Sequence, residues 1–154
     1  MRCVIAMVGA LILAGCATTV PPYGNYLQSR PEVQYKLADE TVEQLSALWP
    51  PARTRFALQQ PTADAFGEAL VKGLRESGYA LEEFMPGGAL MRGAEGSTVA
   101  GESSRPLPLS YVLDAAGDAM LYRLTLKIGA QSLTRPYRLQ DDVLVPVGYW
   151  VKKE

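Results

Sequence analysis

Few residues of this chain have side chains suited to chemistry. The sequence contains no histidine and two cysteines, Cys3 and Cys16. Without histidine, the chain lacks the side chain that most often carries protons near neutral pH and most often binds metals. It also lacks the base of Ser-His and Cys-His nucleophile pairs. The reactive group whose sequence surroundings stand out is the thiol of Cys16, which follows a short apolar segment.

Cys16 directly follows Leu13, Ala14 and Gly15. This arrangement resembles the lipobox of bacterial lipoprotein precursors, in which a small residue before the cysteine lets the signal peptidase approach the backbone. The resemblance implies that Leu13, Ala14 and Gly15 are the peptidase recognition residues and that Cys16 receives a diacylglycerol. A mature bacterial lipoprotein typically carries three fatty acyl chains, such as palmitate. Because one chain gives only marginal membrane binding, three imply a firm anchor.

The segment before Cys16 has the features of a signal peptide. Residues 4–14 form an apolar run that follows Arg2, and this run is shorter than the ~20 residues that span a bilayer. We therefore expect residues 1–15 to be removed; the alternative is an N-terminal core helix with a chance cysteine. After removal no free thiol remains, so the cysteine count gives no information about disulfides, and redox or thiol chemistry is excluded. Ala17 in place of an aspartate implies sorting to the outer membrane, on its periplasmic face.

Other motifs with catalytic or binding potential are incomplete. Gly88 and Gly93 have the spacing of a phosphate loop, but Ala94-Glu95 replaces the required Lys-Ser/Thr pair. Asp141-Asp142 lies in an expected turn, where either a bound cation or a solvated turn is possible. The chain has 15 lysine and arginine residues and 16 acidic residues, a balance without the footprint of a nucleic-acid-binding protein. We expect no enzyme activity, no metal, no cofactor and no direct nucleic-acid binding.

Residues 16–36 are expected to form a linker between the lipid and a folded domain. The segment contains prolines and a glycine and shows no helical period, and 20 extended residues would reach at most ~66 Å. Its tyrosines, Tyr23 and Tyr26 among them, dock either onto a partner or onto this chain's own domain. At the other end, Tyr149-Trp150 is either a partner contact or a means of holding the last strand on the core.

Residues 37–154 are expected to form one α+β domain. Hydrophobic periodicity predicts helices at 37–49 and 63–77, the second capped by Thr62 or Asp64 and ended by Gly78. Alternating patterns predict strands at 53–59, 79–84, 109–114, 120–128 and 131–137. This gives the order α-β-α-β-β-β-β up to residue 137, and a further strand, 144–151, ends the chain.

These elements predict a small two-layer sandwich. The clean alternation of the later strands indicates an antiparallel meander with one covered face, and helix 63–77 would pack across that face. The connection from strand 53–59 through this helix to strand 79–84 fits a crossover between parallel strands. Residues 85–106 contain five glycines and are expected to form a long loop or a loose hairpin.

The segment from Leu48 to Ala80 resembles the TrbH family of conjugal transfer lipoproteins. The resemblance is carried by Pro50-Pro51-Ala52 with Gln59-Gln60-Pro61, by the helix beginning Asp64-Ala65-Phe66-Gly67, and by Gly78-Tyr79-Ala80. It implies a non-catalytic subunit of the mating-pair formation apparatus, a type IV secretion system, in contact with other subunits of the channel. The alternative hypothesis is a tethered periplasmic lipoprotein that regulates an envelope enzyme such as a peptidoglycan synthase.

Overall fold

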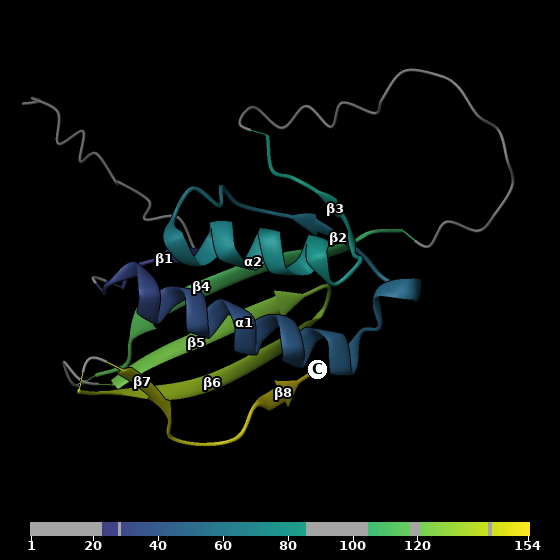
Figure 1. Cartoon of the computed structure of the whole chain (residues 1–154). Helices are drawn as coiled ribbons and strands as arrows, with labels where there is room; N and C mark the ends of the chain where they lie inside the picture. Colours follow the sequence, from purple (N-terminus) through teal and green to yellow (C-terminus); the bar gives the residue numbers. More distant parts are fainter. Residues whose placement is uncertain (1–22, 28, 86–104, 118–120, 142) are drawn as a thin grey trace, which may run out of the picture.

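The computed structural model describes residues 23–27, 29–85, 105–117, 121–141 and 143–154. Two helices lie side by side on one face of a mixed sheet (Figure 1). They are α1 (Pro31–Leu48) and α2 (Ala65–Glu76), and a 3-10 turn, η1 (Pro51–Arg53), follows the first. The predicted α+β fold with two layers is therefore confirmed.

The sheet has a row of strands in the order β3-β2-β4-β5-β6-β7. In addition, β1 pairs with β4 and β8 pairs with β6. The strands are β1 (Gly24–Asn25), β2 (Arg55–Leu58), β3 (Ala80–Glu82), β4 (Leu107–Ala115), β5 (Leu121–Ile128), β6 (Gln131–Gln140), β7 (Val143–Pro146) and β8 (Val151–Lys153). From β4 to β7 the strands form the expected antiparallel meander. As expected, β2 and β3 are parallel across α2.

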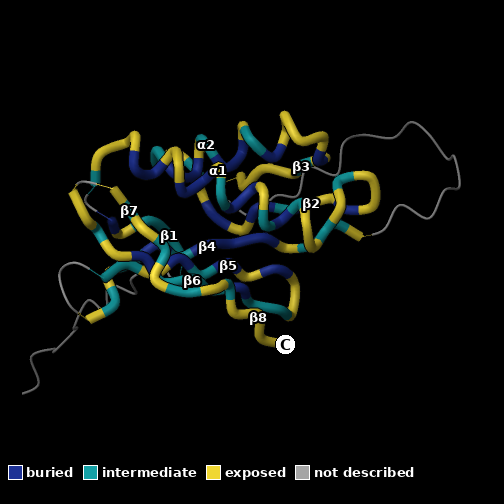
Figure 2. Tube along the Cα trace, turned by 60° about the horizontal axis from the view of Figure 1, so that its bottom comes forward, coloured by how far each residue is buried: buried dark blue, intermediate teal, exposed yellow. Residues whose placement is uncertain are grey.

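The core lies between the helices and the sheet, where the buried segments of both layers meet (Figure 2). Phe66 and Leu70 of α2 and Leu45 of α1 are fully buried there. Alternate residues of β4 and β5 complete the core from the sheet side, among them Tyr111 and Leu126. The opposite face of the sheet, which we call the open face, has no helix of the described residues over it.

The predicted ends of the second helix are close to those observed. The carboxylate of Asp64 caps α2 by accepting a hydrogen bond from the Gly67 N–H at 3.1 Å. Gly78 follows the helix with a φ of +89°, in the left-handed region that glycine adopts without steric cost. The expected loop at 85–106 falls almost entirely on residues 86–104, which lie outside the described part of the chain.

The first helix begins six residues earlier than the sequence pattern indicated, at Pro31 instead of residue 37. Assigning residues 31–36 to the linker was wrong because proline was taken as a sign of irregular structure. A proline is well suited to the first turn of a helix, where its missing N–H has no partner to lose. Val33 and Gln34 are buried, so the first turns of α1 belong to the domain.

The last strand, predicted as one segment at 144–151, is two strands, β7 and β8, which pair with different parts of β6. Pro136 in β6 and Pro146 at the end of β7 both lack an N–H, so a continuous ladder cannot form there. The segment between the strands is held by other bonds. The Val147 N–H donates to the Pro136 carbonyl at 3.0 Å, and Arg135 Nε donates to the Gly148 carbonyl at 2.9 Å.

Candidate functional site

The predicted lipidation residues, Leu13 to Cys16, lie outside the described part of the chain. The described chain begins at Tyr23, whose ring lies 5.8 Å from Lys127 Nζ on β5. The next two residues form β1 and pair with Val112 and Leu113 of β4. Tyr23 therefore contacts the chain's own domain, which is one of the two alternatives expected for the tyrosines of the tether.

The chain is fixed at this point by a polar network centred on Asp64. One oxygen of its carboxylate accepts from Asn25 Nδ2 at 2.8 Å and from the Gly67 N–H at 3.1 Å. The other oxygen accepts from Tyr111 Oη at 2.5 Å. Asn25 also donates to Gln34 Oε1 at 2.7 Å. The network therefore joins β1, α1, α2 and β4. The bonds to the Asp64 carboxylate are charge-assisted, and such bonds are stronger than neutral ones.

Two buried tyrosines lie beside carboxylates. Burial, reinforced by the hydrogen bond to Asp64, raises the pKa of Tyr111 well above its ordinary value. Burial and the negative charge of Glu40 likewise raise the pKa of Tyr137. Both phenols therefore stay protonated and act as hydrogen-bond donors to the acidic side chains. Neither has the lowered pKa that would suit a nucleophile or a base.

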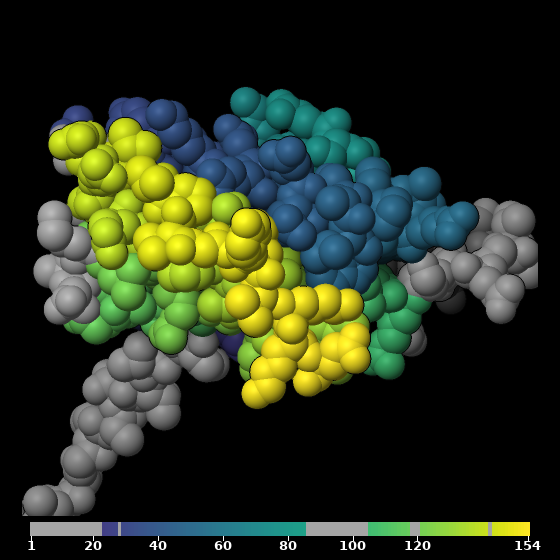
Figure 3. All heavy atoms as spheres, turned by 90° about the horizontal axis from the view of Figure 1, so that it is seen from below, coloured from purple at the N-terminus to yellow at the C-terminus, as the bar shows by residue number. Residues whose placement is uncertain are grey.

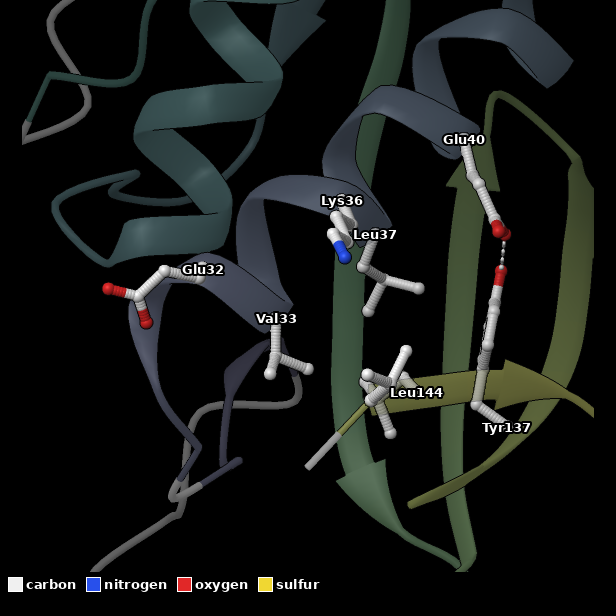
Figure 4. Close-up of a pocket in the computed structure, with 8 residues that line it drawn as sticks. Glu32, Val33, Lys36, Leu37, Glu40, Tyr137 and Leu144 are labelled. Atoms are coloured by element: carbon white, nitrogen blue, oxygen red, sulfur yellow. Dashed lines mark hydrogen bonds between the residues drawn. The ribbon is translucent and has the colours of Figure 1, made fainter. Parts of the chain in front are cut away.

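A hollow of about 80 Å³ lies between the first turns of α1 and the edge of the sheet. Figure 4 shows the side chains of α1, β6 and β7 that line it. The lining residues are Glu32, Val33, Lys36, Leu37, Glu40, Tyr137, Val143 and Leu144. Small-molecule sites usually enclose several hundred Å³, so this hollow, which we call the α1–β7 groove, is suited to one inserted apolar side chain.

One wall of the α1–β7 groove is held by hydrogen bonds. Tyr137 Oη donates to Glu40 Oε2 at 3.1 Å (Figure 4). Arg135 Nη1 approaches the same oxygen at 3.4 Å, and the Arg135 guanidinium lies 5.7 Å from the ring centres of both Tyr137 and Trp150. These contacts leave little rotamer freedom to the wall, which lowers the entropy lost when a partner side chain binds.

The two aromatic residues near the C-terminus have different environments. Trp150 packs against the core, whereas its neighbour Tyr149 is 92% exposed. Trp150 is therefore placed to hold the last strand on the core, and the partner contact expected for Tyr149 and Trp150 stays a prediction. Tyr26 is 45% exposed beside β1, which pairs with β4, whereas β8 pairs with β6. The four aromatic candidates thus form two separate pairs.

Two arginines beside the β2–β3 edge of the sheet form ion pairs. Arg55 lies 3.5 Å from Glu82, and Arg75 is bonded to Glu83. No cluster of metal-ligating side chains occurs in the described residues. Asp141 lies in the turn before β7 with a φ of +49°. No helix in the described part of the chain is long and apolar enough to cross a bilayer.

The comparisons with known proteins identify the family. The family model described as "Conjugal transfer protein TrbH" matches residues 20–154. The chain belongs to the TrbH family. The resemblance noted in the sequence is thereby confirmed, and TrbH membership implies a part in conjugal transfer. TrbH proteins are transfer components and not a known family of enzymes. No curated protein and no solved structure shows a significant match to the chain.

Sequence reasoning missed the partners of Asp64 and the α1–β7 groove. It identified Asp64 as a possible helix cap but gave no sign that Asn25 and Tyr111, 39 and 47 residues away, also bond to it. The groove was missed because three of its lining residues, Glu32, Val33 and Lys36, were assigned to the linker. The clearest available signal was Pro31-Glu32, a proline and an acid that suit the first turn of a helix.

Proposed function

We propose that this TrbH protein is an outer-membrane lipoprotein, anchored through Cys16 on the periplasmic side, that serves as a structural subunit of a conjugative type IV secretion complex. The family match over residues 20–154 carries the proposal. The sequence Leu13-Ala14-Gly15-Cys16 supports lipid attachment. The match to a transfer family favours this function over regulation of an envelope enzyme.

The arrangement of groups in the fold agrees with a binding role. Its buried tyrosines and carboxylates bond to one another, and the α1–β7 groove admits a side chain of a partner more readily than a substrate. We place the contact with another subunit of the channel at this groove, with Tyr26 as a second exposed contact. A preformed groove with an apolar floor is the usual seat of an anchoring side chain in a protein interface.

The anchor is tested by Cys16→Ser, with Cys3→Ser as the matched control because Cys3 lies in the expected leader. We expect Cys16→Ser to abolish incorporation of labelled palmitate, release the protein from the membrane fraction and reduce DNA transfer between cells. Cys3→Ser should leave all three unchanged. Normal fractionation and transfer in the Cys16→Ser strain would refute the proposed anchor.

A further inference from the structure

The open face of the sheet carries an excess of positive charge. Its two acidic residues are neutralised, Glu82 by Arg55 and Asp114 by Arg123, at 3.5 and 2.7 Å. Three cations of this face, Lys127, Arg138 and Lys153, have no ion-pair partner in the described residues. Lys127 and Arg138 alternate with buried residues of β5 and β6, and Lys153 is opposite Ser132, which also alternates with a buried residue of β6. The register therefore places all three on the open face.

The helical layer on the other side has the opposite charge. Helix α1 contains Glu32, Asp39, Glu40 and Glu43 against a single lysine, Lys36. In α2, two acidic residues are balanced by a lysine and an arginine. The domain is therefore polarised across its thickness, acidic on the helix side and basic on the open face. Such a polarity favours one orientation next to a charged surface.

Exposed apolar side chains lie beside the unpaired cations. Every second residue from 145 to 151 is apolar and exposed: Val145, Val147, Tyr149 and Val151. We call these residues the C-terminal apolar row. Val145 is opposite Arg138, and Val151 is opposite Thr134, so both are on the open face. Figure 3 shows the C-terminal segment, in yellow, lying along the outside of the molecule at this edge.

The chain from the expected anchor joins the fold on the same face. Gly24, Val112, Thr125, Thr134 and Val151 are successive partners across the sheet. Four strand spacings of ~4.8 Å place Val151 ~19 Å from Gly24. Tyr23 contacts Lys127 of the open face. Because seven residue steps separate Cys16 from Tyr23, the anchor lies at most ~25 Å from this face, instead of the ~66 Å that a 20-residue linker would allow.

We propose that the open face, with Lys127, Arg138, Lys153 and the C-terminal apolar row, rests on the phosphate-bearing surface of the bilayer that holds the lipid anchor. This inference rests on the proposed lipidation of Cys16. Exposed valines and a tyrosine enter the headgroup boundary, while lysine and arginine side chains reach the lipid phosphates. The acidic helices and the α1–β7 groove then point away from the membrane, where a protein partner can reach them.

The test uses the absence of any free thiol in the processed lipoprotein. Val151→Cys and Tyr35→Cys each give one labelling site, the first on the open face and the second on α1. Their native side chains are 63% and 46% exposed, so both variants are expected to fold. The full lipidated protein, carrying an environment-sensitive fluorophore, is reconstituted in vesicles of phosphatidylethanolamine and phosphatidylglycerol. We expect nitroxide-bearing lipids to quench the label at residue 151 several-fold more strongly than the label at residue 35.

Charge is tested in the same vesicles with Arg138→Glu, and with Lys36→Glu as the matched control on the helical side. Arg138→Glu should reduce the quenching at residue 151, as should high salt, whereas Lys36→Glu should not. Equal quenching at both labels on protein that floats with the vesicles overturns the orientation and leaves the anchor intact. Failure to float refutes the anchor and, with it, this inference. A further measurement uses membranes that contain the transfer apparatus. If the label at residue 151 is shielded there from aqueous quenchers but is not quenched by nitroxide lipids, a protein partner covers the open face, and the proposed contact with the bilayer is overturned.

Discussion

Replacing Asp64 by alanine tests whether the polar network fixes the N-terminal segment to the domain. The carboxylate accepts three hydrogen bonds, from Asn25, the Gly67 N–H and Tyr111. Loss of a helix N-cap costs about 1 kcal/mol. The Tyr111 hydroxyl, on a side chain with no exposed surface, would lose its acceptor, at a cost of about 1–3 kcal/mol.

Together these losses predict that Asp64→Ala lowers the free energy of unfolding by about 3 kcal/mol. That is a large part of the ~5–15 kcal/mol typical of a native domain, and it corresponds to a fall in Tm of roughly 10 °C. Chemical denaturation and calorimetry measure both quantities. Asp39→Ala is the matched control, because Asp39 is exposed on α1 and has no hydrogen bond or ion pair among the described residues.

A double-mutant cycle with Tyr111→Phe separates the hydroxyl bond from the cap. Tyr111→Phe removes one donor and leaves the other two bonds of Asp64 in place, so we expect a loss of about 1 kcal/mol. The double variant should be more stable than the sum of the single losses predicts, by about 1 kcal/mol, because the two groups interact directly. The reasoning fails if Asp64→Ala costs no more than Asp39→Ala, or if the two losses simply add.

The remaining predictions concern alkaline stability and the α1–β7 groove. Burial raises the pKa of Tyr111 and Tyr137 above the ordinary 10.0, so above pH 10.0 the unfolded state loses protons that the folded state keeps. The unfolding free energy should therefore fall by about 1.4 kcal/mol per pH unit for each tyrosine. Denaturation as a function of pH should show a smaller slope for Tyr137→Phe than for the unchanged protein. In the groove, Val143→Trp should fill the hollow and reduce both co-purification of transfer subunits and mating, whereas Val147→Trp should not; equal effects would remove the groove as the contact.

The parts of the fold that the sequence predicts are those set by local patterns. Helix α2 combines an apolar stripe, a cap at Asp64 and a terminal Gly78, and its observed ends are within two residues of the predicted ones. The meander from β4 to β6 follows from period-two alternation. In both cases the information lies within a dozen neighbouring residues, and no long-range contact contradicts it.

The errors occur where a distant contact decides the structure. A single sequence offers no rule by which Asn25 in a proline-rich segment would bond to Asp64, 39 residues later. The same holds for Glu40, whose partners Arg135 and Tyr137 are nearly a hundred residues away. Polar contacts of this kind depend on geometry that only the assembled sheet supplies, so they leave no periodic trace along the chain.

The length of the tether shows how such a contact changes a functional conclusion. Composition alone makes residues 16–36 a flexible spacer that lets the domain stand away from the membrane. Pairing of β1 with β4 and the bonds of Asn25 bring Tyr23 onto the sheet, and this leaves ~25 Å of chain at most between Cys16 and the fold. If Cys16 carries the proposed anchor, a domain held so close, with its basic face on the side where the chain enters, has its orientation restricted by its own structure. Under this proposal the acidic helical face is the one available to the rest of a transfer complex.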